Sequence, residues 1–221
     1  MLRYYGQPKY AGAAPTHLVG YELLLREYAH ATWQRPTDFN AYSSATIAHL
    51  LAQTLATIPQ TLPLVSFNLS QRQFVDPNFC RALATLQANR PMNLYVELTE
   101  TAENVPITAL VAAAKAFGQL GVVVVIDDVG SGANQLCLVR ALRPYTGEYK
   151  FALQNFRAKL TRAQLRQKLL LWRKRATADH KLFALEGVEH CADLALVTLA
   201  QPDVVQGYYY GRPILLNVAG A

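Results

Sequence analysis

Many of the acidic residues in this sequence lie inside or directly after short apolar segments, where acids are rare. The 221-residue chain contains only 15 Asp and Glu residues. Burying a carboxylate in an apolar strand is unfavourable unless a cation or hydrogen bonds compensate. We therefore expect these acids to share a function. They occur in VGYELLLR, LYVELTE, VVVVIDD and LFALEGVE, which contain Glu22, Glu97, Glu100, Asp127, Asp128, Glu186 and Glu189.

The residue types indicate a site for a hard divalent cation. Asn68 closes the apolar segment VSFNLS and adds an amide oxygen to the carboxylates. Oxygen donors without His or Cys suit Mg²⁺ or Mn²⁺ rather than zinc. None of the five histidines lies at a predicted strand end. The predicted ring of oxygen ligands contains Glu22, Asn68, Glu97, Asp127 and Asp128, with Glu186 as a further candidate.

The adjacent Asp127 and Asp128 suggest two metal ions. Neighbouring strand residues point to opposite sides, so both carboxylates can converge only if the strand ends there. The following segment, VGSG, has two glycines suited to such an ending. A shared Asp could then bridge ions roughly 3.5–4 Å apart, as two-metal phosphodiester hydrolysis requires. Considered alone, the pair could instead be a capping or turn acid.

A regular alternation of elements would bring these segments together. Short apolar runs alternate with longer segments of helical spacing, which favours a parallel sheet buried on both faces. The predicted strands are 18–25, 64–70, 94–100, 122–128, 149–154, 181–188 and 204–210. The predicted helices are 42–58, 78–88, 107–120, 133–142, 160–175 and 192–200.

The number of these units favours an α/β fold closed into a barrel. At least seven units in 221 residues fit a (β/α) barrel better than an open doubly wound sheet. The carboxyl ends of barrel strands meet at one mouth, where active sites lie. No glycine-rich dinucleotide or P-loop motif follows the first predicted strand. We expect one domain over residues 1–221.

Composition limits the class of protein further. Hydrophobic residues make up 52% of the chain and charged residues 16%, which suits a sizeable core. No apolar run reaches the roughly 18 residues of a membrane span, and the start lacks a signal-peptide pattern. We therefore expect a soluble, cytoplasmic protein. Cys80, Cys137 and Cys191 are odd in number and far apart, so we expect buried free thiols rather than disulfides or zinc.

The net charge of +6 favours anionic partners. Between Arg157 and Lys181 the chain carries nine basic residues and one acid. Leucines and Trp172 recur there at helical spacing, which predicts an amphipathic helix with a solvated basic face. A nucleic-acid or membrane contact is the alternative. Because no nucleic-acid-binding motif occurs elsewhere, we expect no nucleic acid polymer as partner.

Six ordered motifs in this sequence resemble those of the EAL-domain phosphodiesterases, over almost the whole chain. GYELLLR is similar to the family's Glu-Ala-Leu signature, with Leu23 in place of alanine. FNLS, ELTE, DDVGSG, LEGVE and QGYYYGRP resemble its other motifs, and Gln7-Pro8 matches its opening Gln-Pro. The resemblance implies a modified (β/α)8 TIM-type barrel that hydrolyses cyclic di-GMP to linear pGpG with two Mg²⁺ or Mn²⁺ ions.

The resemblance also implies roles for single residues. One metal would be held by Glu22, Asn68, Glu97 and Asp127, and the second would be held or oriented by Asp127, Asp128 and Glu186. Lys150 would lie near the attacking water and, with Glu186, would position it or relay its proton. Arg26 would neutralise a substrate phosphate, and Gln7 and Gln206 would contact the nucleotide. Glu100 would anchor the loop after Asp128, which lies near a homodimer interface in this family.

The sequence departs from the family at three places, which leaves other functions open. Ala152 stands where the family has an aspartate, Val129 replaces a phenylalanine, and 133–135 replace Tyr-Ser-Ser. One alternative is a catalytically impaired EAL domain that binds cyclic di-GMP or a protein. Another is a metal-dependent barrel hydrolase for a different phosphodiester. The chain has no cyclase motif, so we expect regulation by a separate partner, by dimerisation or by expression.

Overall fold

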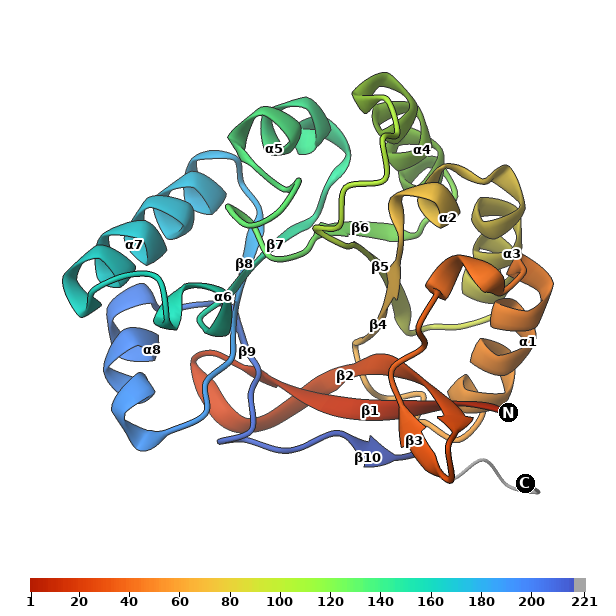
Figure 1. The fold of residues 1–221 in the computed structure, drawn as a ribbon, viewed down its shortest axis with the longest axis horizontal. Coiled ribbons are helices and arrows are strands. Elements are labelled where there is room, and N and C mark those ends of the chain that lie inside the picture. The colour runs from red at the N-terminus through yellow and green to blue at the C-terminus, as the bar shows by residue number, and fades with distance from the viewer. Residues whose placement is uncertain (217–221) are drawn as a thin grey trace.

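The computed structural model describes residues 1–216, and in it eight strands close into a barrel that helices surround (Figure 1). The predicted α/β barrel is therefore confirmed. The barrel strands are β1 (Leu2–Ala11), β2 (Ala14–Ala29), β4 (Leu64–Leu69), β5 (Asn93–Leu98), β6 (Val123–Ile126), β7 (Glu148–Ala152), β8 (Leu182–Glu186) and β9 (Val204–Val205). Two short strands extend the sheet, β3 (Thr32–Gln34) and β10 (Ile214–Leu215).

The first strand modifies the parallel pattern of the barrel. β1 runs antiparallel to both of its barrel neighbours, β2 and β9, whereas each pair from β2 through β4 to β9 is parallel. The sequence prediction placed no strand before Leu18, so β1 was missed. Gly6 and Pro8 interrupt its pattern, and proline usually argues against a strand inside a sheet. The long β1–β2 hairpin supplies the pairing that local sequence does not reveal.

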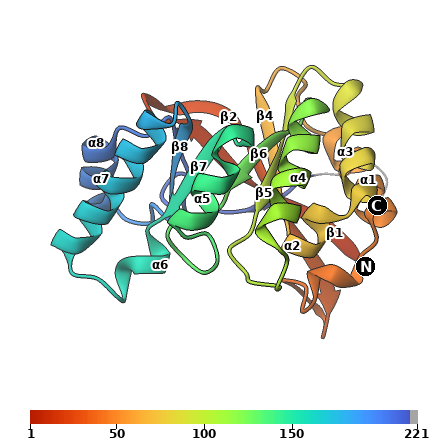
Figure 2. The same cartoon turned by 90° about the horizontal axis from the view of Figure 1, so that it is seen from above.

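Helices cover the outside of the barrel, with α1 and α3 on one side and α7 and α8 on the other (Figure 2). The helices are α1 (Ser44–Leu55), α2 (Gln71–Val75), α3 (Pro77–Ala88), α4 (Ile107–Gln119), α5 (Leu136–Leu142), α6 (Gln154–Arg157), α7 (Arg162–Ala178) and α8 (Leu194–Ala200). Short 3₁₀ turns occupy Phe39–Ala41, Arg143–Tyr145 and Cys191–Asp193. The six predicted helices are confirmed, whereas α2 and α6 were not predicted.

Side-chain chemistry at the helix ends explains where several helices begin. Ser70 and Gln73 form a reciprocal capping box at the start of α2, and Thr161 and Gln164 form one at α7. Asp76 caps α3, whose first residue is proline. These caps satisfy backbone N–H groups that would otherwise lack partners.

The alternation along β5 shows how the sheet separates core from site. Leu94, Val96 and Leu98 belong to the hydrophobic core, while Glu97 contacts the Lys150 ammonium. Successive strand residues point to opposite faces, so the apolar residues face the helices and the acid faces the barrel interior. The core therefore positions the acids by fixing the opposite face of each strand.

Several strand ends differ from the predicted ones, and two cysteines were predicted wrongly. β6 ends at Ile126 and β9 at Val205, earlier than predicted, because the chain turns at the barrel mouth. All three cysteines are free, as expected, but only Cys80 is buried. Cys137 and Cys191 are exposed because they lie on short elements outside the core. Among residues 1–216, no helix is both long and apolar enough to cross a membrane. The predicted domain boundary at 221 lies outside the described residues.

Candidate active site

The predicted site residues come from successive strands and meet at one mouth of the barrel. Each lies within its parallel strand or just after its carboxyl end, and β1 contributes from an antiparallel strand. The polar groups gathered there are Gln7 (β1), Glu22 (β2), Asn68 (β4), Glu97 (β5), Asp127 (after β6), Lys150 (β7), Glu186 (β8) and Gln206 (after β9).

A buried lysine lies at the centre of this ring. Lys150 is fully buried, and its Nζ lies 2.9 Å from Oε1 of Glu186 and 3.1 Å from Oδ1 of Asp127. The same ammonium is 3.5 Å from Oε2 of Glu22 and also contacts Oε2 of Glu97. Four carboxylates therefore share one cation in this structure.

Two amides fix the orientation of Glu22. Nδ2 of Asn68 donates to Oε1 of Glu22 at 2.7 Å, and Nε2 of Gln206 donates to Oε2 at 2.7 Å. Asn68 thus presents its amide nitrogen to Glu22, which leaves its oxygen as a further donor for a cation. These contacts give Gln206 a place beside a predicted metal ligand.

Lys9, which was not among the predicted site residues, lies in the barrel interior. Its Nζ donates to Oε1 of Glu97 at 2.7 Å, and both side chains are almost completely buried. Glu148, another buried acid that was missed, has an Oε1 atom without a hydrogen-bond partner within residues 1–216. The signal for Lys9 was available, because it lies two residues after Gln7 and so faces the same side of β1.

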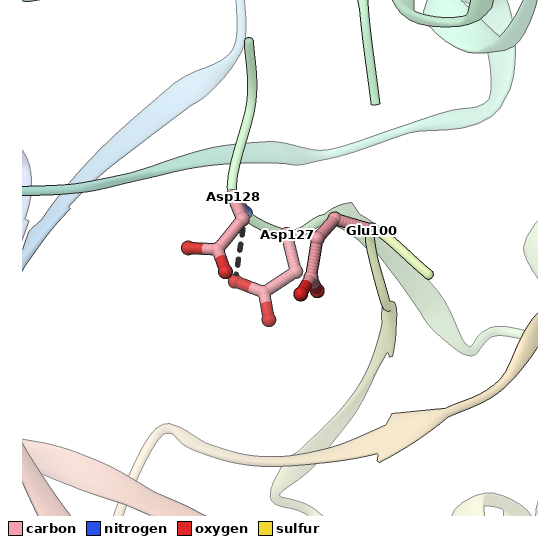
Figure 3. Close-up of side chains that lie close together, drawn as sticks. All are labelled: Glu100, Asp127 and Asp128. Atoms are coloured by element: carbon pink, nitrogen blue, oxygen red, sulfur yellow. Dashed lines mark hydrogen bonds between the residues drawn. The ribbon is translucent and has the colours of Figure 1, made fainter. Parts of the chain in front are cut away.

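A second group of acids lies where β6 ends. Glu100, Asp127 and Asp128 each offer an oxygen within 4.8 Å of the others, and their side chains point into the same space (Figure 3). The backbone N–H of Asp128 donates to Oδ1 of Asp127 at 2.9 Å. A positive φ of 47° at Asp128 turns the chain out of the strand. Both aspartates converge by this turn, as the sequence predicted.

The loop after Asp128 is held against β5. The N–H of Ala133 donates to the Glu100 carbonyl at 2.7 Å, and Nδ2 of Asn134 donates to the Leu98 carbonyl at 3.0 Å. Gly132 has a φ of 45°, and a Cβ there would lie 2.3 Å from the Glu100 carbonyl oxygen. Only glycine allows this approach, so the loop is tied to the backbone of Glu100.

A cavity of about 770 Å³ opens above the ring. This volume lies within the range of roughly 300–1,000 Å³ typical of small-molecule sites. Glu97, Lys150 and Gln206 do not line the cavity and lie below its floor. The predicted site residues that line it are Gln7, Glu22, Arg26, Asn68, Glu100, Asp127, Asp128 and Glu186.

A family model described as "EAL domain" matches residues 2–213. The chain belongs to the EAL domain family. No curated protein sequence matches this EAL domain.

Solved EAL structures share the fold of this EAL domain at low sequence identity. The PaMucR phosphodiesterase in complex with c-di-GMP is 21% identical, with a TM-score of 0.75, and the match covers 97% of each chain. The YkuI protein of Bacillus subtilis, solved with c-di-GMP and calcium, is 18% identical with a TM-score of 0.78; the match covers 97% of this chain and 56% of YkuI.

Some of the similar EAL structures are longer than this chain. The EAL enzyme Bd1971, bound to cAMP and cyclic di-GMP, is 20% identical with a TM-score of 0.80. That match covers 97% of this chain but 62% of Bd1971. This EAL domain thus spans less than two thirds of that enzyme's length.

The electrostatics of the EAL-domain ring divide its acids into two kinds. Burial would raise the pKa of Glu97, but the ammonium groups of Lys150 and Lys9 outweigh it and hold this pKa at about 2. Burial raises the pKa of Glu186 to about 8, and neighbouring carboxylates add to the effect despite Lys150. Burial likewise raises the pKa of Asp127 well above its ordinary value. Such opposed shifts are frequent at active sites.

The donor set fits a hard divalent cation. Carboxylate oxygens with one amide oxygen match Mg²⁺ or Mn²⁺, and EAL domains use divalent metals. The acids of the ring outnumber the two buried lysines, so the ring gains net negative charge when a cation displaces the protons of Glu186 and Asp127. The group of acids whose oxygens lie within 4.8 Å of one another includes Glu100, which the sequence predicted only as a loop anchor.

Proposed function

We propose that this EAL domain is a cyclic di-GMP phosphodiesterase that needs a divalent metal and releases linear pGpG. The observation that carries the proposal is the oxygen-rich ring on the floor of a cavity large enough for a nucleotide. Membership of the EAL family and the c-di-GMP complexes of PaMucR and YkuI support the choice of substrate.

In this proposal, two Mg²⁺ or Mn²⁺ ions occupy the mouth of the barrel. Glu22, Asn68, Glu97 and Asp127 would hold one ion, and Asp127, Asp128 and Glu186 would hold or orient the other. Bound metal lowers the pKa of water and stabilises charge on the phosphoryl oxygens. The contacts of Asn68 and Gln206 with Glu22 support this assignment, because they orient a ligand carboxylate before metal binds.

Lys150 and Glu186 are the proposed catalytic residues. The Lys150 ammonium, which burial and four carboxylates keep in the ring, would donate hydrogen bonds to the attacking water. Glu186, with its pKa of about 8, can hold or release a proton near neutral pH. Their ion pair at 2.9 Å supports a joint role in positioning the water and relaying its proton.

Three residues would recognise the substrate. Arg26 and Gln7 line the cavity, and an arginine suits a phosphodiester oxygen. Gln206 lies deeper and is 3% exposed, so in this proposal it reaches the nucleotide through the side chain of Glu22 or after a change of rotamer. Glu100 would set the position of the loop after Asp128.

One departure from the family favours a second candidate function, that of a cyclic di-GMP receptor without turnover. Ala152 ends β7 beside Glu186 in the strand register and is fully buried. A family aspartate at this strand end would add a carboxylate next to the ring. The absence of this aspartate favours binding without turnover, although the other proposed metal ligands remain.

The test is incubation of purified protein with cyclic di-GMP and Mg²⁺ or Mn²⁺, with products resolved by chromatography. Metal-dependent pGpG that disappears with a chelator supports the phosphodiesterase. Binding detected by calorimetry without product supports the receptor. A protein that neither binds nor cleaves cyclic di-GMP, but cleaves another phosphodiester, contradicts both.

We also propose that the domain forms a homodimer through the loop after Asp128 and is regulated by a separate protein. The exposed side chains of Leu136 and Cys137, at the start of α5, lie close to this loop in sequence and support a contact there. Light scattering at several protein concentrations tests it, and a monomer throughout would contradict it.

A further inference from the structure

Two arginines lie beside the last residue pair of the β2–β3 hairpin. The antiparallel register of the hairpin ends at the pair Glu27 and Gln34, and Arg26 and Arg35 are the residues next to that pair. Both residues line the cavity.

This pair of positive charges has no ion-pair partner within the part of the chain that the structure describes. None of the ion pairs within residues 1–216 includes Arg26 or Arg35. Arg26 donates one hydrogen bond to the Leu25 carbonyl at 2.9 Å. Burial, followed by the charge of Arg35, lowers the pKa of Arg26 below its ordinary value. Neighbouring like charges repel each other, and an anion between the two guanidinium groups would relieve that repulsion.

The rest of the cavity has the opposite charge. Its floor carries Glu22, Asp127, Asp128 and Glu186, which suit cations that in turn bind a phosphodiester. The arginine pair therefore offers a second, separate place for an anion. A ligand that uses both places needs two phosphate groups, one at the acidic floor and one at the arginines.

We propose that Arg35 joins Arg26 to form a second phosphate site, which selects a substrate with two phosphodiesters over one with a single phosphate. The inference rests on the proposed cyclic dinucleotide function and adds Arg35 as a specificity residue. Arginine suits this role because its guanidinium donates parallel hydrogen bonds to two phosphate oxygens. Cyclic mononucleotides, with one phosphate, cannot use both places at once.

Arg3 provides a matched control. It pairs with Arg26 in the β1–β2 register, so it stands at the same level of the sheet. Its guanidinium lies 4.8 Å from the ring centre of Trp33, and Arg3 does not line the cavity. Arg3→Gln and Arg35→Gln each remove one positive charge from neighbouring positions. A difference between their effects on cyclic di-GMP therefore comes from the position of Arg35 in the cavity.

The experiment compares cyclic di-GMP with bis(p-nitrophenyl) phosphate, a diester with one phosphate, for the wild type and both variants. We expect Arg35→Gln to raise the KM for cyclic di-GMP about tenfold, the loss typical of one charge-assisted hydrogen bond. The effect of Arg35→Gln on the KM for bis(p-nitrophenyl) phosphate is expected to be several-fold smaller. Arg3→Gln is expected to stay within about twofold of the wild type on both substrates.

Binding provides a readout that needs no turnover. Calorimetry with cyclic di-GMP and Ca²⁺ is expected to show an about tenfold weaker Kd for Arg35→Gln and partial recovery for Arg35→Lys. Because Arg35 is exposed, these variants are expected to keep the wild-type melting temperature, which is measured alongside.

Two results would overturn the inference while leaving the proposed function intact. One is an active wild type together with the same KM for cyclic di-GMP in the Arg35→Gln and Arg3→Gln variants. The other is an equal loss for Arg35→Gln on both substrates. A wild type that neither binds nor cleaves cyclic di-GMP instead removes the proposed function, and the second phosphate site with it.

Discussion

The side-chain nitrogen of Lys150 lies 2.9 Å from Oε1 of Glu186, inside a ring of acids that the barrel brings together from separate strands. Lys150 comes from β7 and Glu186 from the neighbouring β8, whose strands pair in parallel. The lysine compensates the charge of the buried acids, and Glu186 retains a proton near neutral pH. Stability and the proposed chemistry therefore depend on the same groups.

Removing a proposed ligand should abolish metal-dependent activity without unfolding the barrel. We expect Glu22→Ala to lower turnover of cyclic di-GMP by roughly 100-fold or more, because metal stabilisation of developing charge contributes several kcal/mol. Chromatography measures the product, and circular dichroism reports folding. Glu27→Ala, on the same strand but outside the cavity, is the control. Unchanged turnover in a folded Glu22→Ala protein would refute the ligand assignment.

Removing the central lysine should destabilise the metal-free protein. Lys150→Met leaves several buried carboxylates without their shared cation, and breaking a buried ion pair costs about 3–5 kcal/mol. Urea denaturation in the presence of a chelator measures the free energy of unfolding. Lys174→Met, at an exposed position of α7, should change it by less than about 0.5 kcal/mol. Equal stability of the two variants would show that Lys150 does not support the ring.

Metal should stabilise the protein more at pH 8.5 than at pH 6.5. Glu186 has a pKa of about 8 in the fold, against about 4.3 in an unfolded chain. Its raised pKa therefore adds stability that is complete below about pH 4.3 and is lost as the pH rises through 8. Metal competes with that proton, so its binding strengthens over the same interval.

Melting temperatures with Mg²⁺ and with a chelator, recorded across this pH range, measure the effect of metal. The metal-induced shift is expected to grow with pH in the wild type. Glu186→Gln, which has no proton to lose, should flatten this dependence. A metal-induced shift that is the same at both pH values in the wild type would contradict the role of Glu186.

Stability at acid pH should depend partly on Asp193. Burial would raise its pKa, but N–H groups of Glu189 and His190 and the guanidinium of Arg157 outweigh this effect and lower it. A lowered pKa in the fold adds stability that is present above about pH 4 and is lost as the pH falls below it.

Asp193→Asn tests this contribution by denaturation between pH 3 and pH 7. Relative to the wild type, the variant should lose most stability at pH 7 and least at pH 3, because protonated Asp193 resembles asparagine in charge. His190→Ala, which keeps the backbone N–H, is the control. A difference from the wild type that does not vary with pH would show that the Asp193 charge plays no part.

Much of the fold and of the candidate site could be predicted from sequence because both leave local signals. Apolar runs that alternate with helical spacing indicated the β/α units, and each helix that periodicity predicted is present. Acids inside apolar runs are rare, so Glu22, Glu97 and Glu186 stood out, and their strands bring them to one mouth. The strand β1 was missed because Gly6 and Pro8 interrupt its local pattern.

The sequence by itself determined which side chains share one face of a strand, because the period of two along a strand is a local property. Tertiary structure decided which of them meet. Closure of the barrel placed Lys150 among four acids and Lys9 beside Glu97. The β2–β3 hairpin brought Arg35 to the same cavity as Arg26. Such contacts join residues far apart in the chain or depend on strand register, and a pattern within one segment carries no information about either.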